Sequence, residues 1–278
     1  MWATEVDVPA VRSFLEAHVT GSMFPLVNLR DNGLDGDHPR SVNFWVLRDG
    51  DKITDVLTIS QEGVVFPQCP NMNWETVAPA LKGRGIQGFI GNRTQVRSLQ
   101  SAISLDDAEA FLDHDEPQFL LNLSEMPVPD GPGQIIPIAD APGATVRTWM
   151  LDYQMNALNM AEQPARAVVE NSYTTYCANQ SHVVLMDGDT PISMTGFNAR
   201  LPDIVQIGGV YTPPQLRGRG YARRALALHL EQVRAQGVTR ATLFAANASA
   251  VAAYEAIGFT KIGEWTLCLF TEEQHIDV

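Results

Sequence analysis

The chain contains few cysteines. Three of them, Cys69, Cys177 and Cys268, are spread across 278 residues, with no CxxC pair and no even count. Disulfide frameworks and zinc sites need closely spaced, usually paired cysteines, so neither is expected. The pattern instead predicts free, buried thiols in the reducing cytoplasm and no bound metal.

Basic residues are also scarce relative to acidic ones. Lysine and arginine total 19 against 32 acidic residues, which gives a formal charge of −13. Binding to nucleic acid without sequence preference needs an excess of basic side chains to neutralise phosphates. The net negative charge therefore argues against a nucleic-acid partner, and it does not indicate any other partner.

A long uninterrupted apolar run is missing as well. The least polar long window, residues 241–259, is broken by Asn247, Ser249 and Glu255, and the first 19 residues lack the basic and apolar regions of a secretion signal. We therefore expect no membrane association and a cytoplasmic location. Hydrophobic residues make up 45% of the chain and charged residues 18%, a globular composition that excludes a disordered, collagen-like or coiled-coil protein.

A proline- and glycine-rich segment divides the sequence. Residues 126–143 contain five prolines and three glycines, so neither a helix nor a strand ladder continues easily there. This predicts a linker at 127–142 between a first domain at 1–126 and a second at 143–278. Residues 1–137 carry 9 basic and 19 acidic side chains, and residues 138–278 carry 10 and 13.

The second half shows alternating helical and strand patterns, which indicate a mixed α/β fold. The strongest local signal is the turn Asp187-Gly188-Asp189 between two β-rich runs, which predicts a hairpin. Apolar spacing and breakers give the other elements. They are a short strand at 144–149, helices at 151–160 and 165–178, a strand at 204–212, a helix at 220–236, a strand at 239–245, a helix at 249–257 and a strand pair at 259–270.

The first half repeats part of this order. Its hairpin signal is the turn Asp49-Gly50-Asp51 between predicted strands at 41–48 and 52–60. Helices are expected at 8–18 and 74–81, and strands at 87–91 and 117–123. The shared order suggests a duplicated and diverged domain as a hypothesis.

A basic glycine loop is the most informative segment of the chain. A predicted strand leads through Thr212-Pro213-Pro214 into Arg217-Gly218-Arg219-Gly220, and an amphipathic helix follows directly. Glycines let backbone N–H groups approach phosphate oxygens, and a helix N-terminus adds partial positive charge. Together with Arg223 and Arg224, the loop holds four of the ten basic residues of the second half. The pattern favours a phosphorylated ligand, and its plain alternative is a solvated basic helix start.

Two other phosphate motifs do not fit. A P-loop needs Lys and then Ser or Thr after its second glycine, which this loop lacks, and a dinucleotide fingerprint would need glycine where Arg223 stands. The first half contains Gly83-x-Gly85-x-x-Gly88, but a helical segment precedes it and a strand-like run follows, which is the wrong context for that fingerprint.

Residues 210–222 resemble the acyl-CoA pyrophosphate loop of the GNAT N-acetyltransferase superfamily. The family pattern, Gln/Arg-x-x-Gly-x-Gly/Ala, is met by Arg217, Gly220 and Ala222, and an overlapping frame begins at Gln215. A second family motif follows at the proper distance, with Asn247, then Tyr254, then Gly258-Phe259. The resemblance covers roughly residues 138–278.

This resemblance implies a mixed-sheet α/β domain that takes acetyl-CoA as co-substrate. The strand before the loop would splay from its neighbour and bond the pantetheine arm, the loop amides would hold the pyrophosphate, and Tyr254 would protonate the departing thiolate. The implied cofactor contacts are Val210, Tyr211, Thr212, Arg217, Gly218, Arg219, Gly220, Tyr221, Ala222 and Asn247.

The general base is not indicated by the sequence. Many relatives carry a carboxylate on the strand before the loop, but that strand here has no acid, and Gln206 is not a useful proton acceptor. Glu170, His182 and the C-terminal acids are alternatives, none of them favoured; some relatives bind an amine that is already neutral and need no base.

The leading functional hypothesis is acetyl transfer to an amine of a small molecule or amino acid. The alternatives are a CoA-binding regulatory or scaffold protein without turnover, and an acetyltransferase of protein or peptide amines. The first domain lacks a pyrophosphate loop, so as a GNAT-like domain it would have lost cofactor binding. The sequence indicates neither the acceptor, the acyl chain length nor the oligomeric state.

Overall fold

The computed structural model describes residues 1–276, and the chain divides into two compact units. The first unit comprises Met1–Glu116 and Gly263–Val278, and the second comprises Pro117–Ile262. This division differs from the boundary predicted at 127–142, which lies inside the second unit, and the end of the predicted second domain returns to the first unit. The physical reason is that the proline-rich segment contains strand β6 (Gln134–Pro137). This strand pairs with a strand of the second unit, so the segment belongs to that unit.

The first unit is a mixed sheet with helices. Its strand order is β1-β2-β3-β4-β11, with β3 and β4 parallel and the other pairs antiparallel. Its elements are α1 (Val8–Ala17), α2 (Val19–Asn32), β1 (Val42–Asp49), β2 (Lys52–Ser60), β3 (Val64–Gln68), α3 (Trp74–Val77), η1 (Ala78–Leu81), β4 (Ile86–Asn92), α4 (Arg93–Ala102), the start of β5 (Ala110–Asn122) and most of β11 (Thr260–Gln274).

Turn chemistry accounts for the hairpin of the first unit. Gly50 has φ +57° between β1 and β2, where glycine carries no steric cost, so the predicted hairpin is confirmed. Helix α2 was not predicted, because Gly21 and Pro25 lie inside it and weaken any helical signal. Met23, Leu26 and other buried side chains nevertheless hold it against the sheet.

The second unit is also built on a mixed sheet, in the order β5-β10-β9-β8-β7-β6, in which only the β9–β10 pair is parallel. Its further elements are η2 (Leu123–Glu125), η3 (Ile138–Asp140), α5 (Gly143–Asn156), α6 (Glu162–Asn179), β7 (His182–Asp187), β8 (Thr190–Arg200), β9 (Ile204–Tyr211), η4 (Pro214–Leu216), α7 (Tyr221–Arg234), β10 (Arg240–Phe244) and α8 (Ala248–Glu255).

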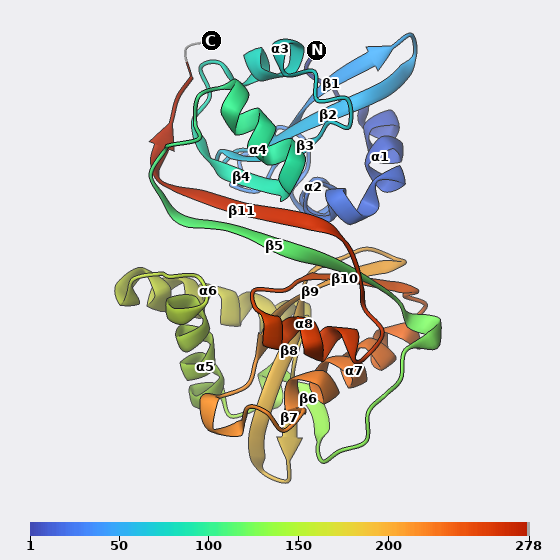
Figure 1. The fold of residues 1–278 in the computed structure, drawn as a ribbon, viewed down its shortest axis with the longest axis vertical. Helices are drawn as coiled ribbons and strands as arrows, with labels where there is room; N and C mark the ends of the chain where they lie inside the picture. Colours follow the sequence, from blue (N-terminus) through green and yellow to red (C-terminus); the bar gives the residue numbers. More distant parts are fainter. Residues whose placement is uncertain (277–278) are drawn as a thin grey trace. The chain divides into compact units, whose positions relative to one another are not determined.

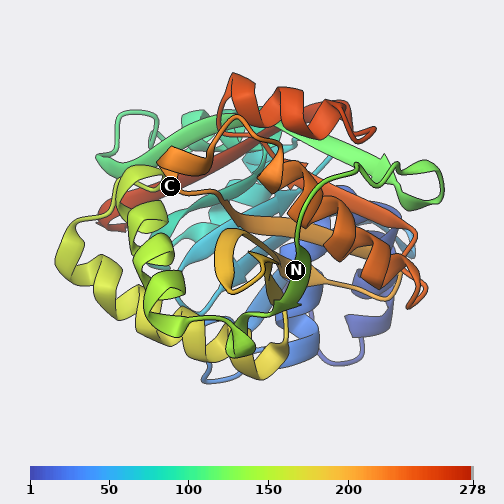
Figure 2. The same cartoon turned by 90° about the horizontal axis from the view of Figure 1, so that it is seen from below.

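Helices cover both faces of this sheet (Figures 1 and 2). Helices α5 and α6 lie on one side, and α7 and α8 lie on the other. The first side buries Trp149 and Val169 against Val184. The opposite side buries Leu226 and Leu230 with strand residues such as Val205 and Ile207. The mixed α/β architecture expected from the sequence is therefore present in this unit.

Two local predictions for the second half of the chain were wrong. Residues 144–149 are not a strand but the first part of α5, since Val146 and Trp149, three residues apart, pack one helix face onto the sheet. Residues 259–270 are not a strand pair but part of the single long strand β11.

None of the helices in the described part of the chain combines the length and the apolar composition that a membrane span requires.

Candidate functional site

Strands β9 and β10 separate shortly after they begin. Their parallel pairing covers Arg240↔Ile204, Ala241↔Val205 and Thr242↔Gln206, and no later pair joins them. From Ile207 onward, the edge of β9 that faced β10 has no strand neighbour among residues 1–276. An unpaired edge offers backbone N–H and C=O groups to an extended ligand. This stretch contains Val210 and leads into Thr212, where the resemblance placed the pantetheine contacts.

A bulge lies within the open part of β9. Met194 pairs with Tyr211 and Gly196 with Gly208, so three steps along β9 match two along β8. Gly209 takes up the extra residue with φ +61°, in the left-handed region that favours glycine. The Gly208-Gly209 pair within a strand was a sequence signal for this bulge, and sequence reasoning missed it.

The glycine loop presents amides that have no protein acceptor. Gly218 and Gly220 have φ +76° and +80°, and Gly220 is the N-cap of the 14-residue helix α7, without a side-chain cap. Among the described residues, no acceptor bonds the amides of Gly218, Arg219 or Gly220. Tyr221 and Ala222 supply the first helical amides behind them. Unsatisfied amides at a helix N-terminus fit an anionic group such as a pyrophosphate.

The arginines of the loop serve different purposes. Arg217 donates from Nε to the Thr212 carbonyl at 2.9 Å and so closes the turn. Arg224 donates to the carbonyls of the proline-rich segment, to Pro129 at 2.6 Å and to Pro132 at 2.9 Å. Arg217 and Arg224 therefore stabilise the local backbone, Arg217 at the turn and Arg224 at the proline-rich segment.

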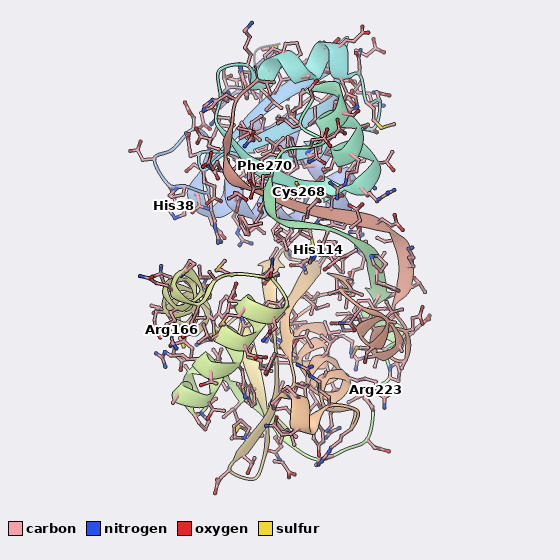
Figure 3. The ribbon with its side chains drawn as sticks, turned by 60° about the vertical axis from the view of Figure 1, so that its left-hand side comes forward. His38, His114, Arg166, Arg223, Cys268 and Phe270 are labelled. Atoms are coloured by element: carbon pink, nitrogen blue, oxygen red, sulfur yellow. The ribbon has the colours of Figure 1, made fainter. Side chains whose placement is uncertain are left out.

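Two cations remain for an anion. Arg219 is exposed, and no described ion pair engages it. Arg223, labelled on α7 in Figure 3, has a buried Nε without a partner among the described residues. Its guanidinium lies 3.5 Å from the position that a Cβ on Gly220 would occupy. The positive charge at the helix start is thus concentrated at Arg219 and Arg223.

The Tyr211 side chain points into the core and not toward the open edge. Its hydroxyl donates to Asp152 Oδ2 at 2.7 Å, and its ring packs against Trp149 at 5.8 Å. Burial, followed by the hydrogen bond to Asp152, raises the pKa of Tyr211 to about 12. Tyr211 therefore offers a ligand its backbone. Asp152, on α5, was not found from the sequence, because nothing in the local pattern places it beside the end of β9.

Asn247 and Tyr254 occupy opposite ends of α8. Asn247 is exposed and caps the helix, since its Oδ1 accepts from the Ala250 amide at 3.0 Å. Its Nδ2 group remains for other partners. Tyr254 is buried, with its ring edge-on to Phe259 at 5.9 Å. The predicted motif thus forms one local unit in which Tyr254 and Phe259 share the core.

The base alternatives have contrasting environments. Glu170 accepts from Arg147 Nε at 3.1 Å and is exposed. His182 is fully buried. Gln206, which is not one of these alternatives, is buried, with Nε2 bonded to the Ile207 carbonyl at 2.5 Å and Oε1 without a described partner. The C-terminal acids Glu272 and Glu273 belong to the first unit.

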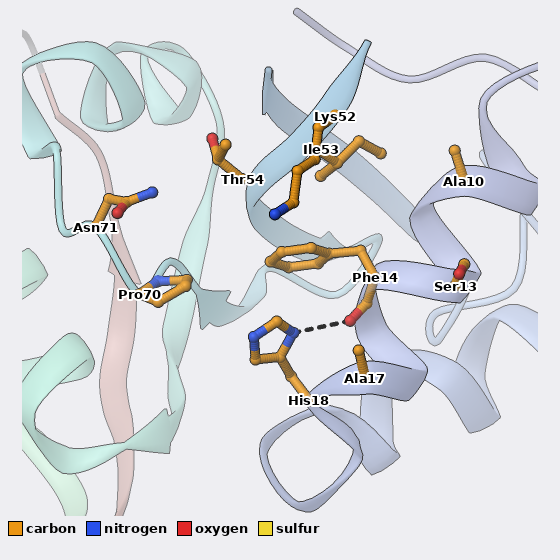
Figure 4. A pocket seen from close by; sticks show the side chains of 10 residues that line it. All are labelled: Ala10, Ser13, Phe14, Ala17, His18, Lys52, Ile53, Thr54, Pro70 and Asn71. Atoms are coloured by element: carbon orange, nitrogen blue, oxygen red, sulfur yellow. Dashed lines mark hydrogen bonds between the residues drawn. The ribbon is translucent and has the colours of Figure 1, made fainter. Parts of the chain in front are cut away.

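The first unit contains a cavity of about 660 Å³ between α1 and β2 (Figure 4). Phe14 and His18 contact each other there with tilted rings whose centroids lie 4.5 Å apart, and Lys52 lies across from them. No described group of three or more His, Cys, Asp or Glu side chains in either unit could hold a metal ion.

Comparison with known proteins identifies the second unit. Residues 145–259 match the model of the acetyltransferase (GNAT) family, and these residues form a domain of that family. The match contains the open strand, the glycine loop and the Asn247–Phe259 motif. A comparison with the curated proteins found no match.

Solved structures share the fold over nearly the whole chain. A Drosophila protein is 15% identical, with a TM-score of 0.64 and coverage of 97% of each chain. A GCN5-related N-acetyltransferase from Sphaerobacter thermophilus is 14% identical, with a TM-score of 0.59 and coverage of 100% of this chain and 97% of that one. A tandem GNAT protein of the clavulanic acid pathway is 13% identical, with a TM-score of 0.54 and coverage of 96% and 98%.

Proposed function

We propose that the second unit is an acetyl-CoA-dependent N-acetyltransferase whose acceptor is an amine of a small molecule or amino acid. One observation carries this proposal: an open strand edge leads directly into a helix start whose amides lack a protein acceptor. The edge suits the amide-rich pantetheine arm, and the loop suits the pyrophosphate. The family of residues 145–259 supports the same activity.

The proposal assigns a binding or catalytic role to each of the following residues. The backbone of Val210 and Thr212 binds the extended arm, while the amides from Gly218 to Ala222, with Arg219 and Arg223, hold the phosphates. Acetyl-CoA supplies a thioester whose carbonyl carbon an amine nitrogen can attack. Tyr254 donates a proton to the departing thiolate, as a general acid. Asn247 keeps its Nδ2 group for the arm while its Oδ1 caps α8.

The first unit would be a second, GNAT-like domain that does not hold the cofactor. The fold match to a tandem GNAT protein along 96% of this chain supports a tandem arrangement. We place the protein in the cytoplasm, in keeping with its three free cysteines.

The decisive experiment combines a calorimetric titration with acetyl-CoA and a thiol-release assay over a panel of amines. We expect one equivalent of acetyl-CoA per chain and turnover on at least one small amine. Absence of binding would refute the proposal, and a second equivalent would refute cofactor loss in the first unit.

A second candidate is a CoA-binding regulatory protein without turnover. It is favoured by one observation, the absence of any carboxylate on β9. Tight binding with no thiol release on any amine would support it. Turnover on peptide amines alone would instead indicate a protein acetyltransferase.

A further inference from the structure

Asn198 of β8 is an exposed side chain beside the open stretch of β9. The two strands pair through Phe197↔Ile207 and then through Ala199↔Gln206, so Asn198 is an extra residue on β8 and forms a β-bulge. Bulges change the direction of a side chain and are common next to active sites. The bulge therefore gives Asn198 a direction that the regular alternation of β8 would not give it.

A glycine in β9 makes room for the Asn198 side chain. A Cβ on Gly208 would overlap the amide group of Asn198, so a side chain at position 208 and the amide in its present place exclude each other. Gly208, unlike Gly209, does not lie in the left-handed region, so its backbone conformation does not require glycine. The close approach of Asn198 accounts for the glycine instead.

The Asn198 amide lies near the inner end of the open strand edge. Strand β8 flanks β9 on one side, and on the other side β10 leaves β9 unpaired from Ile207 onward. Because Gly208 has no side chain, none stands at this position between the amide and the open edge. A pantetheine arm that enters at Thr212 and follows the edge inward would pass four residues, about 13 Å, before it reaches Gly208. The thioester at the inner end of the arm would therefore lie close to Asn198.

The amide of Asn198 is accessible and free to bind a ligand. Asn198 is exposed and Gly208 and Gly209 are partly exposed, so a molecule can reach this place from solvent. Within residues 1–276, no hydrogen bond engages Oδ1 or Nδ2 of Asn198. A carboxamide carries one acceptor oxygen and one donor group side by side. It can therefore bind two neighbouring groups of one small molecule.

We propose that Asn198 selects the acceptor. Its Oδ1 accepts a hydrogen bond from the amine N–H, and its Nδ2 donates to an oxygen on the carbon next to the one that bears the amine. The acceptor class is therefore that of α-amino acids and 2-amino alcohols or ethers, in preference to simple alkylamines. This inference rests on the proposed acetyl transfer and adds its substrate class.

The bonds and protons of the transfer balance without a proton on Asn198, because a carboxamide is neither an acid nor a base at physiological pH. The amine nitrogen forms the C–N bond as the C–S bond breaks, and the nitrogen loses one proton to solvent. Tyr254 gives one proton to the departing sulfur and regains one from solvent. The amine must therefore arrive uncharged, which agrees with the absence of a carboxylate on β9.

The chain offers a matched control in Asn179, the last residue of α6. Asn179 is also an exposed asparagine, and it lies outside the β8–β9 pair. Loss of an exposed carboxamide is therefore common to Asn198→Ala and Asn179→Ala, and nearness to Gly208 is not.

The test measures two amines of equal length, 2-methoxyethylamine and butylamine, with Asn198→Ala, Asn198→Asp and Asn179→Ala in the full chain. The readout is the ratio of the two kcat/KM values, and comparing variants at one pH cancels the different basicity of the amines. Asn198→Ala should lower the ratio about three- to tenfold, because the ether oxygen loses its donor. Asn198→Asp, which keeps an acceptor oxygen but has no donor, should lower the ratio and keep butylamine turnover within a few-fold. Asn179→Ala should match the wild type.

Calorimetry with acetyl-CoA should give the wild-type affinity for all three variants, which reports both folding and the cofactor site. A wild-type ratio in Asn198→Ala with acetyl-CoA bound would overturn the inference, and so would an equal fall in Asn179→Ala. Wild-type turnover confined to amines without a neighbouring oxygen would do the same. Failure of the wild type to bind acetyl-CoA would instead refute the proposed function.

Discussion

Each unit contains one pair of parallel strands that separates after a short contact, and the two units differ in what lies at the gap between these strands. In the first unit, β3 and β4 pair only at Val64↔Gly88 and Val65↔Phe89. In the second, β9 and β10 pair over three residues and then part. The same topology thus produces a splayed edge in both units.

The first unit satisfies its edge with its own side chains. Pro67 has no N–H, and its Cδ lies 3.3 Å from the position of a Cβ on Gly91, across the gap in β4. The Cys69 amide donates to Gln95 Oε1 at 2.6 Å, and the Asn71 amide donates to buried Asp55 at 3.0 Å. The helix that follows, α3, has four residues.

The second unit leaves the corresponding groups open. Its loop amides have no described acceptor, and a 14-residue helix begins behind them. An anion at the first site would meet the Asp55 carboxylate, whereas at the second it would meet free amides and arginine. We therefore expect a phosphate site at the second splayed strand pair, where the loop supplies donors and no internal acceptors, and none at the first.

The two units also share an asparagine cap. Asn92 begins α4 and accepts from the Thr94 and Gln95 amides, just as Asn247 begins α8 and accepts from Ala250. The asparagine alone is a helix-start signal and does not mark a cofactor site. Tyrosine distinguishes the two helices, because α4 has none and α8 has Tyr254.

The largest effect is expected from Tyr254→Phe, which removes the group that α4 lacks. Acyl transfer should slow by about 10²–10⁴-fold if protonation of the thiolate limits turnover, because a general acid contributes that much. Single-turnover kinetics would measure the rate, and calorimetry should show unchanged acetyl-CoA affinity. Tyr173→Phe, on α6, is the matched control and should leave the rate intact. An unchanged rate in Tyr254→Phe would remove this residue from the mechanism.

Gly220→Val should convert the second loop into one that cannot bind a phosphate. A β-branched residue at φ +80° is strained, so the amides would lose their common direction and acetyl-CoA affinity should fall about 100-fold. Calorimetry measures the loss. Gly237→Val is the control, because Gly237 has φ +99° at the other end of α7, with no atom near its Cβ position. If both variants bound acetyl-CoA equally, the loop assignment would be wrong.

Sequence reasoning was most successful where local chemistry decides the structure. The Asp-Gly-Asp turns, the strand–loop–helix around Gly220 and the helix ending before Gly258 were all predicted and are present. The strand prediction for residues 144–149 was wrong. Their β-branched and aromatic side chains suit a strand, but the packing of Val146 and Trp149 onto the sheet stabilises a helix.

The candidate site could be predicted only in part. Glycines and arginines are visible in the sequence, but their partners are not. That Arg224 would bond Pro129, 95 positions away, or that His182 would lie against Gly209, depends on strand order and on the bulge. Such contacts arise from tertiary packing, which no local pattern encodes.

Asp55→Asn should weaken the first unit and spare the proposed cofactor site. The buried carboxylate accepts from both the amide and Nδ2 of Asn71, at 3.0 and 2.9 Å, and an amide side chain can satisfy only one of these donors. The free energy of unfolding should fall by about 1–3 kcal/mol in a urea titration. Asp51→Asn, exposed in the hairpin turn, is the control. Reduced acetyl-CoA affinity in Asp55→Asn would show that the first unit does take part in binding.

The smallest effects should separate two neighbouring arginines of α7. Arg223 has a buried Nε without a described partner, so Arg223→Ala should weaken acetyl-CoA binding about two- to tenfold and reduce its dependence on salt, as expected for one partly solvated charge on a phosphate. Arg224 holds the carbonyls of Pro129 and Pro132, so Arg224→Ala should lower the melting temperature and leave the salt dependence unchanged. Calorimetry at low and high ionic strength, paired with thermal unfolding, distinguishes the two. If Arg224→Ala gave the larger loss of affinity, the phosphates would lie nearer the proline-rich segment than the open amides indicate.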